Sequence, residues 1–137
     1  MNIAFLDHDK KKELMVQFCT AYKSILAKHN LCATATTGRL LRDKTGLPGQ
    51  TRLSHKQGGH QQINARIAYN EIDKVLLFTD PNDMDPAENA QLIETIHHCD
   101  RQNVPIATNL AAAEMLVRGL QRGDLDWREM YRNKRIF

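Results

Sequence analysis

The nine-residue segment "SHKQGGHQQ", residues 54–62, concentrates side chains that are able to do chemistry. It holds the hydroxyl of Ser54, the imidazoles of His55 and His60, and a pair of glycines between them. A hydroxyl beside a glycine-rich loop binds anions through its O–H and through backbone N–H groups. An imidazole has an ordinary pKa of about 6.5 and is mostly neutral at pH 7, so it suits a general base. The segment is therefore either a solvated loop or the rim of an anion site.

Two other segments supply groups that suit a phosphate. Lys12 ends "HDKKK" at 8–12, and its ammonium reaches an anion as a point charge. "TATTG" at 34–38 leads into a predicted helix, whose N-terminus favours anions through unpaired N–H groups. Its candidate phosphate ligands are the threonine hydroxyls of Thr34, Thr36 and Thr37.

Together with Ser54, these groups predict a phosphate site built from three segments. The alternative for each piece is plainer: the threonines are β-branched strand residues and the lysines a solvated face. The sequence has no P-loop and no G-x-G-x-x-G motif, so a nucleotide is not the expected ligand.

Strands and helices alternate along the chain and place these groups. Short apolar runs predict strands at 2–9, 31–38, 73–81 and 104–109. Amphipathic or capped segments predict helices at 10–30, 39–46, 61–72, 85–103 and 110–123. The alternation predicts an α/β fold: a doubly wound, Rossmann-like parallel sheet with helices on both faces, in a single domain over residues 1–137. Ligands of such folds bind at the carboxyl ends of the strands, where the polar residues cluster here.

Composition narrows the class of partner. The net charge is only +3 and no long basic run appears, which argues against nucleic acid and favours a small anion. The three cysteines are widely spaced and form no C-x-x-C pair, which predicts a reducing compartment and no structural zinc site. No apolar run is long enough for a membrane span. We expect a cytoplasmic protein without a metal.

Several motifs together resemble methylglyoxal synthases. They are "IAFLDHDKKKELMVQF", "ATATTG", the GGxQQ frame of "GGHQQ", the Asp80-Pro81 pair and "PIATN", in family order from Asn2 to about Tyr131. The resemblance implies a hexameric, doubly wound α/β enzyme that uses no cofactor. Such an enzyme converts dihydroxyacetone phosphate to methylglyoxal and inorganic phosphate, after a carboxylate removes a proton next to the carbonyl.

The resemblance also assigns residues. The family's phosphate-holding positions match Lys12, Thr34, Thr36, Thr37 and Ser54, and a glycine whose N–H faces the substrate is replaced by His55. Its polar residues after two strands match His8, Asp9 and Asp80. The family's basic residue near the C-terminus, which reaches the phosphate site of an adjacent subunit, matches Arg132, Lys134 or Arg135.

Two departures affect the chemistry. The aspartate that removes the proton in the family is His60 here. A downstream histidine and aspartate of the family fall on Ala87 and Ala90 in the best register, and on Glu88 and Gln91 when the register shifts by one. A positioned base contributes roughly 10²–10⁴ in rate, so these changes bear directly on activity.

Three functions follow. The first is a lyase of methylglyoxal synthase type with His60 in the place of the base and His8, Asp9 and Asp80 beside it. The second is a protein that binds or senses phosphate or a phosphorylated metabolite. The third is altered chemistry, in which His55, Lys56 and His60 suit a larger or more anionic substrate.

Overall fold

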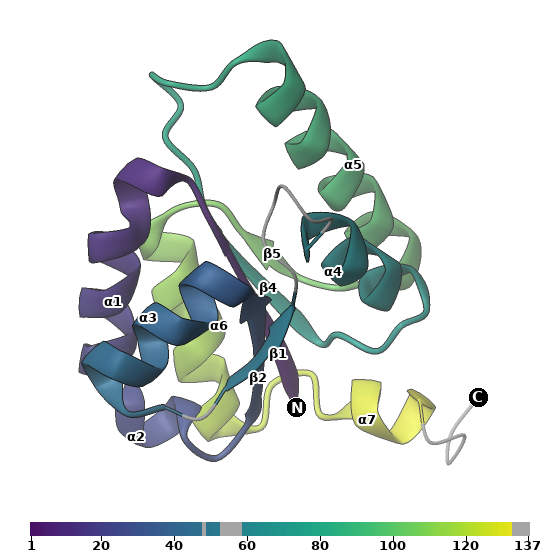
Figure 1. Cartoon of the computed structure of the whole chain (residues 1–137). Helices are drawn as coiled ribbons and strands as arrows, with labels where there is room; N and C mark the ends of the chain where they lie inside the picture. Colours follow the sequence, from purple (N-terminus) through teal and green to yellow (C-terminus); the bar gives the residue numbers. More distant parts are fainter. Residues whose placement is uncertain (48, 53–58, 133–137) are drawn as a thin grey trace.

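A five-stranded parallel sheet forms the centre of the computed structural model, which describes residues 1–47, 49–52 and 59–132. The strand order is β3-β2-β1-β4-β5, and all neighbours run parallel (Figure 1). The strands are β1 (Asn2–Asp7), β2 (Asn30–Thr34), β3 (Gly49–Arg52), β4 (Lys74–Phe78) and β5 (Ile106–Ala107).

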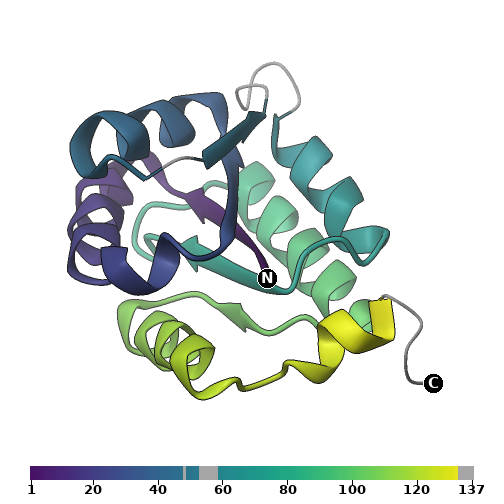
Figure 2. The same ribbon diagram turned by 90° about the horizontal axis from the view of Figure 1, so that it is seen from below.

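Helices cover both faces of this sheet. They are η1 (Asp9–Lys11), α1 (Lys12–Ala21), α2 (Lys23–Leu26), α3 (Ala35–Thr45), α4 (Gly59–Ala68), α5 (Pro86–Gln102), α6 (Leu110–Arg122) and α7 (Trp127–Arg132). Helices α1, α3 and α6 pack on one face, and α4 and α5 pack on the other (Figures 1 and 2). The prediction of a doubly wound α/β fold is confirmed.

The central strand β1 explains why its sequence is apolar without alternation. Successive side chains of a strand point to opposite faces, and both faces of this sheet are covered. Ile3 and Phe5 therefore join the hydrophobic cluster under α1, α3 and α6, while Ala4 and Leu6 join the cluster under α4 and α5. Asp7 is the last residue of β1, and it is buried although it is charged.

Several predicted boundaries differ from the structure, and two of the differences are large. The strand predicted at 31–38 ends at Thr34, and the following residues form the first turn of α3, with Thr34 in the extended N-cap conformation. The helix predicted at 10–30 ends earlier, and Asn30 does not cap it but opens β2 opposite Asn2. Strand β3 was not predicted, because "GQTR" at the sheet edge carries no apolar signal.

Helix caps followed the sequence more closely. Gly46 ends α3 with φ 74°, a left-handed conformation that glycine adopts without strain. Asp85 is the N-cap of α5, and its Oδ1 atom accepts a hydrogen bond from the backbone N–H of Glu88 at 2.8 Å. This cap fixes the residue at which α5 starts. No helix in the described part of the chain is long and apolar enough to span a membrane.

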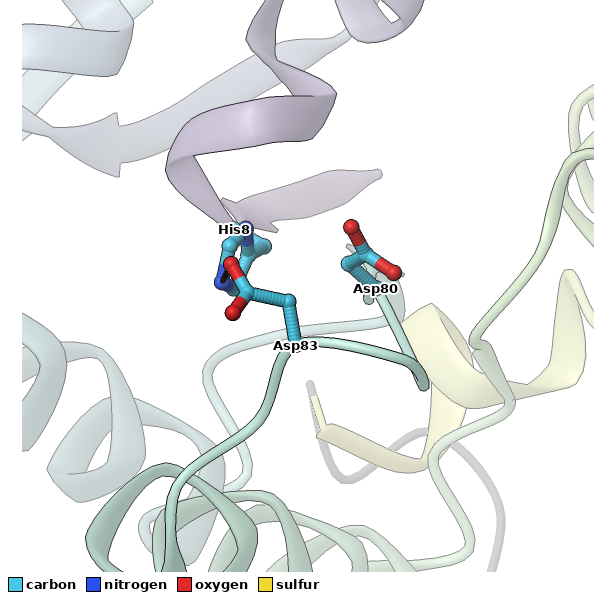
Figure 3. Close-up of side chains that lie close together, drawn as sticks. All are labelled: His8, Asp80 and Asp83. Atoms are coloured by element: carbon cyan, nitrogen blue, oxygen red, sulfur yellow. Dashed lines mark ion pairs between the residues drawn. The ribbon is translucent and has the colours of Figure 1, made fainter.

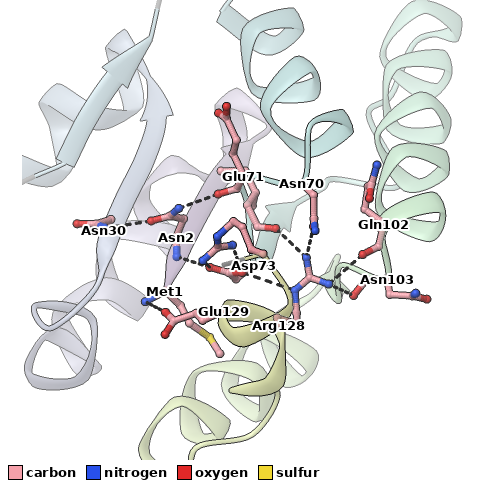
Figure 4. A network of polar contacts seen from close by, with 12 residues as sticks. Met1, Asn2, Asn30, Asn70, Glu71, Asp73, Gln102, Asn103, Arg128 and Glu129 are labelled. Atoms are coloured by element: carbon pink, nitrogen blue, oxygen red, sulfur yellow. Dashed lines mark hydrogen bonds and ion pairs between the residues drawn. The ribbon is translucent and has the colours of Figure 1, made fainter. Parts of the chain in front are cut away.

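A buried polar network fixes α7 against the amino end of the sheet (Figure 4). Asp73 has no exposed side-chain surface, and it accepts hydrogen bonds from the backbone N–H of Asn2 and from both Nη atoms of Arg132. Arg128 lies beside the same carboxylate and donates to the carbonyl oxygens of Gln102 at 2.9 Å and Asn103 at 2.6 Å. The network lies at the edge opposite to the carboxyl ends of the strands.

Candidate functional site

A pocket lies where β1 and β4 end, with α4 and α5 opposite them. It contains about 410 Å³ of empty space, part of which is open to solvent. Its apolar floor comes from the ends of the two strands, and its polar lining comes from Asp7, His8, His60, Thr79, Glu88 and Gln91. The carboxyl edge of the sheet is where ligands of doubly wound folds bind.

His8 presents an N–H group to this pocket. The residue caps η1, and its Nδ1 atom accepts a hydrogen bond from the backbone N–H of Lys10 at 3.1 Å. A neutral imidazole that accepts at Nδ1 carries its hydrogen on Nε2. That Nε2 atom lies 3.4 Å from Oε2 of Glu88 and 3.5 Å from Oδ2 of Asp83. The ring is therefore oriented as a hydrogen-bond donor.

His8, Asp80 and Asp83 have ligand atoms within 4.8 Å of one another (Figure 3), a spacing that a metal ion could use. The contacts argue otherwise. Nζ of Lys10 lies 2.7 Å from Oδ2 of Asp83, which lowers the pKa of Asp83 and raises that of Lys10. Oδ1 of Asp80 accepts from the backbone N–H of Asn82 at 3.1 Å. Nε2 of His8 carries a hydrogen where a metal needs a lone pair.

His60 lies near the start of α4 and is 7% exposed. Its Nε2 atom is 3.1 Å from Oγ1 of Thr95 on α5. The Thr95 hydroxyl also lies 2.8 Å from Oδ1 of Asn64 and 3.0 Å from the carbonyl oxygen of Gln91, and it has one hydrogen to give to these acceptors. It therefore accepts from His60, so the neutral ring holds its hydrogen on Nε2 and its lone pair on Nδ1.

Lys12 and Thr37, two of the predicted phosphate ligands, meet at the carboxylate of Asp7. The Thr37 hydroxyl donates to Oδ1 of Asp7 at 2.7 Å, and Nζ of Lys12 donates to Oδ2 at 3.2 Å. Nζ of Lys12 is also 3.3 Å from Oδ1 of Asp9, whose side chain is 92% exposed. No role was predicted for Asp7, although its place at the end of a buried strand was a signal.

The other predicted site residues that the structure describes do not share one contact. Thr34 is buried at the junction of β2 and α3, and Thr36 is exposed on the first turn of that helix. Asp80 is half-buried in the turn after β4, close to His8 and not in the pocket lining.

Some predicted residues lie outside the described part of the chain. They are Ser54, His55, Lys134 and Arg135, together with Lys56 of the altered-chemistry hypothesis. Arg132 is described, and it binds Asp73 at the amino end of the sheet.

Two pairs of α5 residues were considered in the sequence, Ala87 with Ala90 and Glu88 with Gln91, and only the second pair faces the pocket. Ala87 and Ala90 are exposed, whereas Glu88 and Gln91 are half-buried and line the pocket. Residues three apart share one face of a helix, and the packing of α5 on α4 and the sheet turns this face toward the pocket. A carboxylate and an amide of α5 therefore line the pocket. Glu88 and Gln91 are the pair that the sequence offered when the register shifts by one.

Comparisons with known proteins show the family to which the chain belongs. Residues 14–108 match a family model described as an MGS-like domain. The chain is 52% identical over 134 residues to the methylglyoxal synthase of Caldicellulosiruptor saccharolyticus, covering 98% of this chain and 94% of that protein. It is 47% identical over 133 residues to that of Listeria monocytogenes, covering 97% and 98%. A crystal structure of methylglyoxal synthase from Elizabethkingia anophelis superposes with a TM-score of 0.76 at 34% identity, covering 85% of this chain and 76% of that one. The chain belongs to the methylglyoxal synthase family.

Proposed function

We propose that this protein is a lyase of methylglyoxal synthase type, which converts dihydroxyacetone phosphate to methylglyoxal and inorganic phosphate. The observation that carries the proposal is the pocket itself: two imidazoles with assignable tautomers, His8 and His60, line one cavity in a chain that is 52% identical to a methylglyoxal synthase. A base removes a proton from the hydroxymethyl carbon beside the carbonyl. The enediolate then expels phosphate by breaking the carbon–oxygen bond, and the remaining enol tautomerises to methylglyoxal.

His60 is the proposed base. With its Nε2–H bound to Thr95, the neutral ring carries its lone pair on Nδ1, a buried atom that the substrate would have to reach for His60 to act as the base. Thr95 also holds the ring against α5, so the imidazole does not need to be oriented at the moment of reaction. A proton taken at Nδ1 makes an imidazolium whose Nε2–H remains bound to the Thr95 hydroxyl.

His8 is the proposed donor to the carbonyl oxygen. Its Nε2–H points toward the carboxylates of Glu88 and Asp83 at 3.4 and 3.5 Å, distances long enough for a substrate oxygen to compete for the hydrogen. A donor aimed at a developing enolate is worth roughly 10²–10³ in rate. Glu88 is the alternative proton acceptor, because it supplies a carboxylate in the same pocket.

The phosphate group would be held by Lys12, Thr36, Thr37 and the N-terminus of α3, while Ser54 and His55 remain ligands predicted from the sequence alone. Asp9 and Asp80 flank this edge and would orient Lys12 and the turn that follows β4. We further propose a homohexamer in the cytoplasm, in line with the family resemblance.

A turnover assay tests this function. Purified protein is incubated with dihydroxyacetone phosphate while methylglyoxal and free phosphate are followed, beside His60→Ala, His60→Asp and the exposed-histidine control His97→Ala. We expect turnover in the wild type, a loss of about 10²-fold or more in His60→Ala, and no change in His97→Ala. Equal turnover in His60→Ala and the wild type would remove His60 as the base, and Glu88→Gln would then be the variant to lose activity.

A second function is favoured by one observation. The Asp7 carboxylate already accepts hydrogen bonds from Lys12 and Thr37, two of the proposed phosphate ligands. A site with such an internal competitor suits a protein that binds phosphate reversibly as a signal. Under that function, phosphate raises the melting temperature of the protein while dihydroxyacetone phosphate is bound without being converted.

A further inference from the structure

We propose that Asp7 is a specificity-determining residue: its buried carboxylate competes with the ligand phosphate for Lys12 and Thr37 and thereby lowers the affinity for dianions. The inference rests on the proposed function, because it concerns the same phosphate site. It assigns a role to a residue that the motif "IAFLDHDKKKELMVQF" contains but to which the resemblance gave none.

The carboxylate of Asp7 is held in place. Its side chain is 1% exposed, and Thr37, which donates to it, has no exposed surface. Asp7 ends β1, whose backbone pairs with β4 on one side, where Asp7 is in register with Phe78, and with β2 on the other. A ligand therefore cannot displace the carboxylate by a small movement of an exposed side chain. The ligand must instead compete for Lys12 and Thr37 while both of them donate hydrogen bonds to Asp7.

The hydrogen bonds already made by Thr37 and Lys12 limit the donors that they can offer to a phosphate. Thr37 has one hydroxyl hydrogen, and Asp7 accepts it, whereas phosphate oxygens need donors. Lys12 has three hydrogens, and two of its directions are taken by Asp7 and Asp9. Thr37 and Lys12 can both donate to a phosphate only after the Thr37 hydroxyl turns its hydrogen away from Asp7.

The charge balance acts in the same direction. One ammonium, Lys12, faces two carboxylates, Asp7 and Asp9, at 3.2 and 3.3 Å. Asp9 is exposed and screened by water, but Asp7 is not, so its repulsion of an incoming anion is only weakly attenuated. Repulsion grows with the charge of the ligand, so Asp7 disfavours a phosphate dianion more than a monoanion of the same shape.

The substitution Asp7→Asn tests this inference, because asparagine has nearly the same shape and no charge. Dissociation constants for inorganic phosphate at pH 8 and for perchlorate, a tetrahedral monoanion, are measured by calorimetry for the wild type, for Asp7→Asn and for the control Asp100→Asn on the exposed face of α5. Asp7→Ser provides a second neutral variant if the asparagine protein does not fold.

We expect the neutral Asp7 variants to bind phosphate about 10-fold tighter than the wild type, with a smaller gain for perchlorate and none in Asp100→Asn. Unchanged or weaker phosphate binding in the neutral variants would overturn the inference, since Asp7 would then position Lys12 and Thr37 for the ligand. Equal gains for phosphate and perchlorate would also overturn it, because a charge effect scales with ligand charge. Turnover of dihydroxyacetone phosphate by the wild type is scored separately: its absence defeats the lyase function, while tighter phosphate binding in Asp7→Asn still supports the role of Asp7.

Discussion

The imidazole of His60 on α4 donates a hydrogen bond to the hydroxyl of Thr95 on α5, across 3.1 Å in a buried interface between the two helices. This contact joins the pocket to the helix packing on one face of the sheet. The same hydroxyl serves Asn64 and the backbone of Gln91, so one side chain on α5 fixes three groups at once. The orientation of the proposed base therefore depends on a residue that does not itself line the pocket.

Replacing Thr95 with valine should reduce both stability and activity. Valine keeps the shape of threonine but removes the buried hydroxyl that bonds Nε2 of His60 and Oδ1 of Asn64, at a cost of about 2 kcal/mol in the free energy of unfolding. Turnover should fall mainly through kcat, because the ring loses its orientation while the phosphate ligands are unchanged. Urea unfolding and steady-state kinetics measure the two effects. Thr20→Val is the control, since the Thr20 hydroxyl bonds the Val16 carbonyl on an exposed helix face, and its effect should stay within about 0.5 kcal/mol.

Replacing Arg128 with methionine should destabilise the protein strongly. Arg128 is 3% exposed, and its loss leaves the carbonyl oxygens of Gln102 and Asn103 without their donors and Asp73 with one cation fewer. We expect a loss of about 3 kcal/mol in the free energy of unfolding. The control is Arg118→Met, because Arg118 forms an exposed pair with Glu114, and such pairs contribute less than about 1 kcal/mol. Similar losses in the two variants would show that the network in Figure 4 contributes little.

Replacing Lys74 with methionine should stabilise the protein near neutral pH. Lys74 is 1% exposed, its Nζ donates to the Leu116 carbonyl at 2.9 Å, and burial lowers its pKa below the ordinary 10.5. Because the unfolded chain holds this proton more tightly than the folded protein does, the wild type gains stability as the pH rises through the folded-state pKa toward 10.5.

The variant Lys74→Met lacks this titration. It should be more stable than the wild type by about 1 kcal/mol at pH 7, and the difference should shrink as the pH approaches 10.5. Urea unfolding at several pH values gives the difference directly. The exposed Lys28, replaced in the same way, should show a difference that does not vary with pH. A constant difference for Lys74→Met would mean that its ammonium is hydrated in the folded state.

The fold was predictable because its signals are local. Apolar runs such as that of β1 and β4, caps such as Asp85 and the terminating Gly46 each depend on neighbouring residues. The sequence could not place the boundary at Thr34, because threonines suit both a strand and a helix cap. It also could not show β3, a short edge strand that is defined by its backbone pairing with β2 and not by an apolar pattern of its own.

The site was predictable in its groups and less so in its contacts. Lys12 and Thr37 do lie together, as expected from the shared edge of the sheet. What they bind in the folded chain depends on where the Asp7 side chain points, which is set by β1 pairing on both sides. The choice of Glu88 over Ala87 depends on the rotation of α5, which the packing of that helix on α4 and the sheet determines.

The Asp7 cluster and the imidazole pair also differ in how much chain each one requires. Asp7, Lys12 and Thr37 belong to one contiguous stretch that ends in α3, and the longest of their contacts spans 30 residues. The contact of His8 with Glu88 and the bond of His60 to Thr95 need α5, which begins only at Pro86. Since the entropy lost on closing a loop grows with its length, the cluster of Asp7, Lys12 and Thr37 forms at a smaller entropic cost than the contacts of the two histidines with α5.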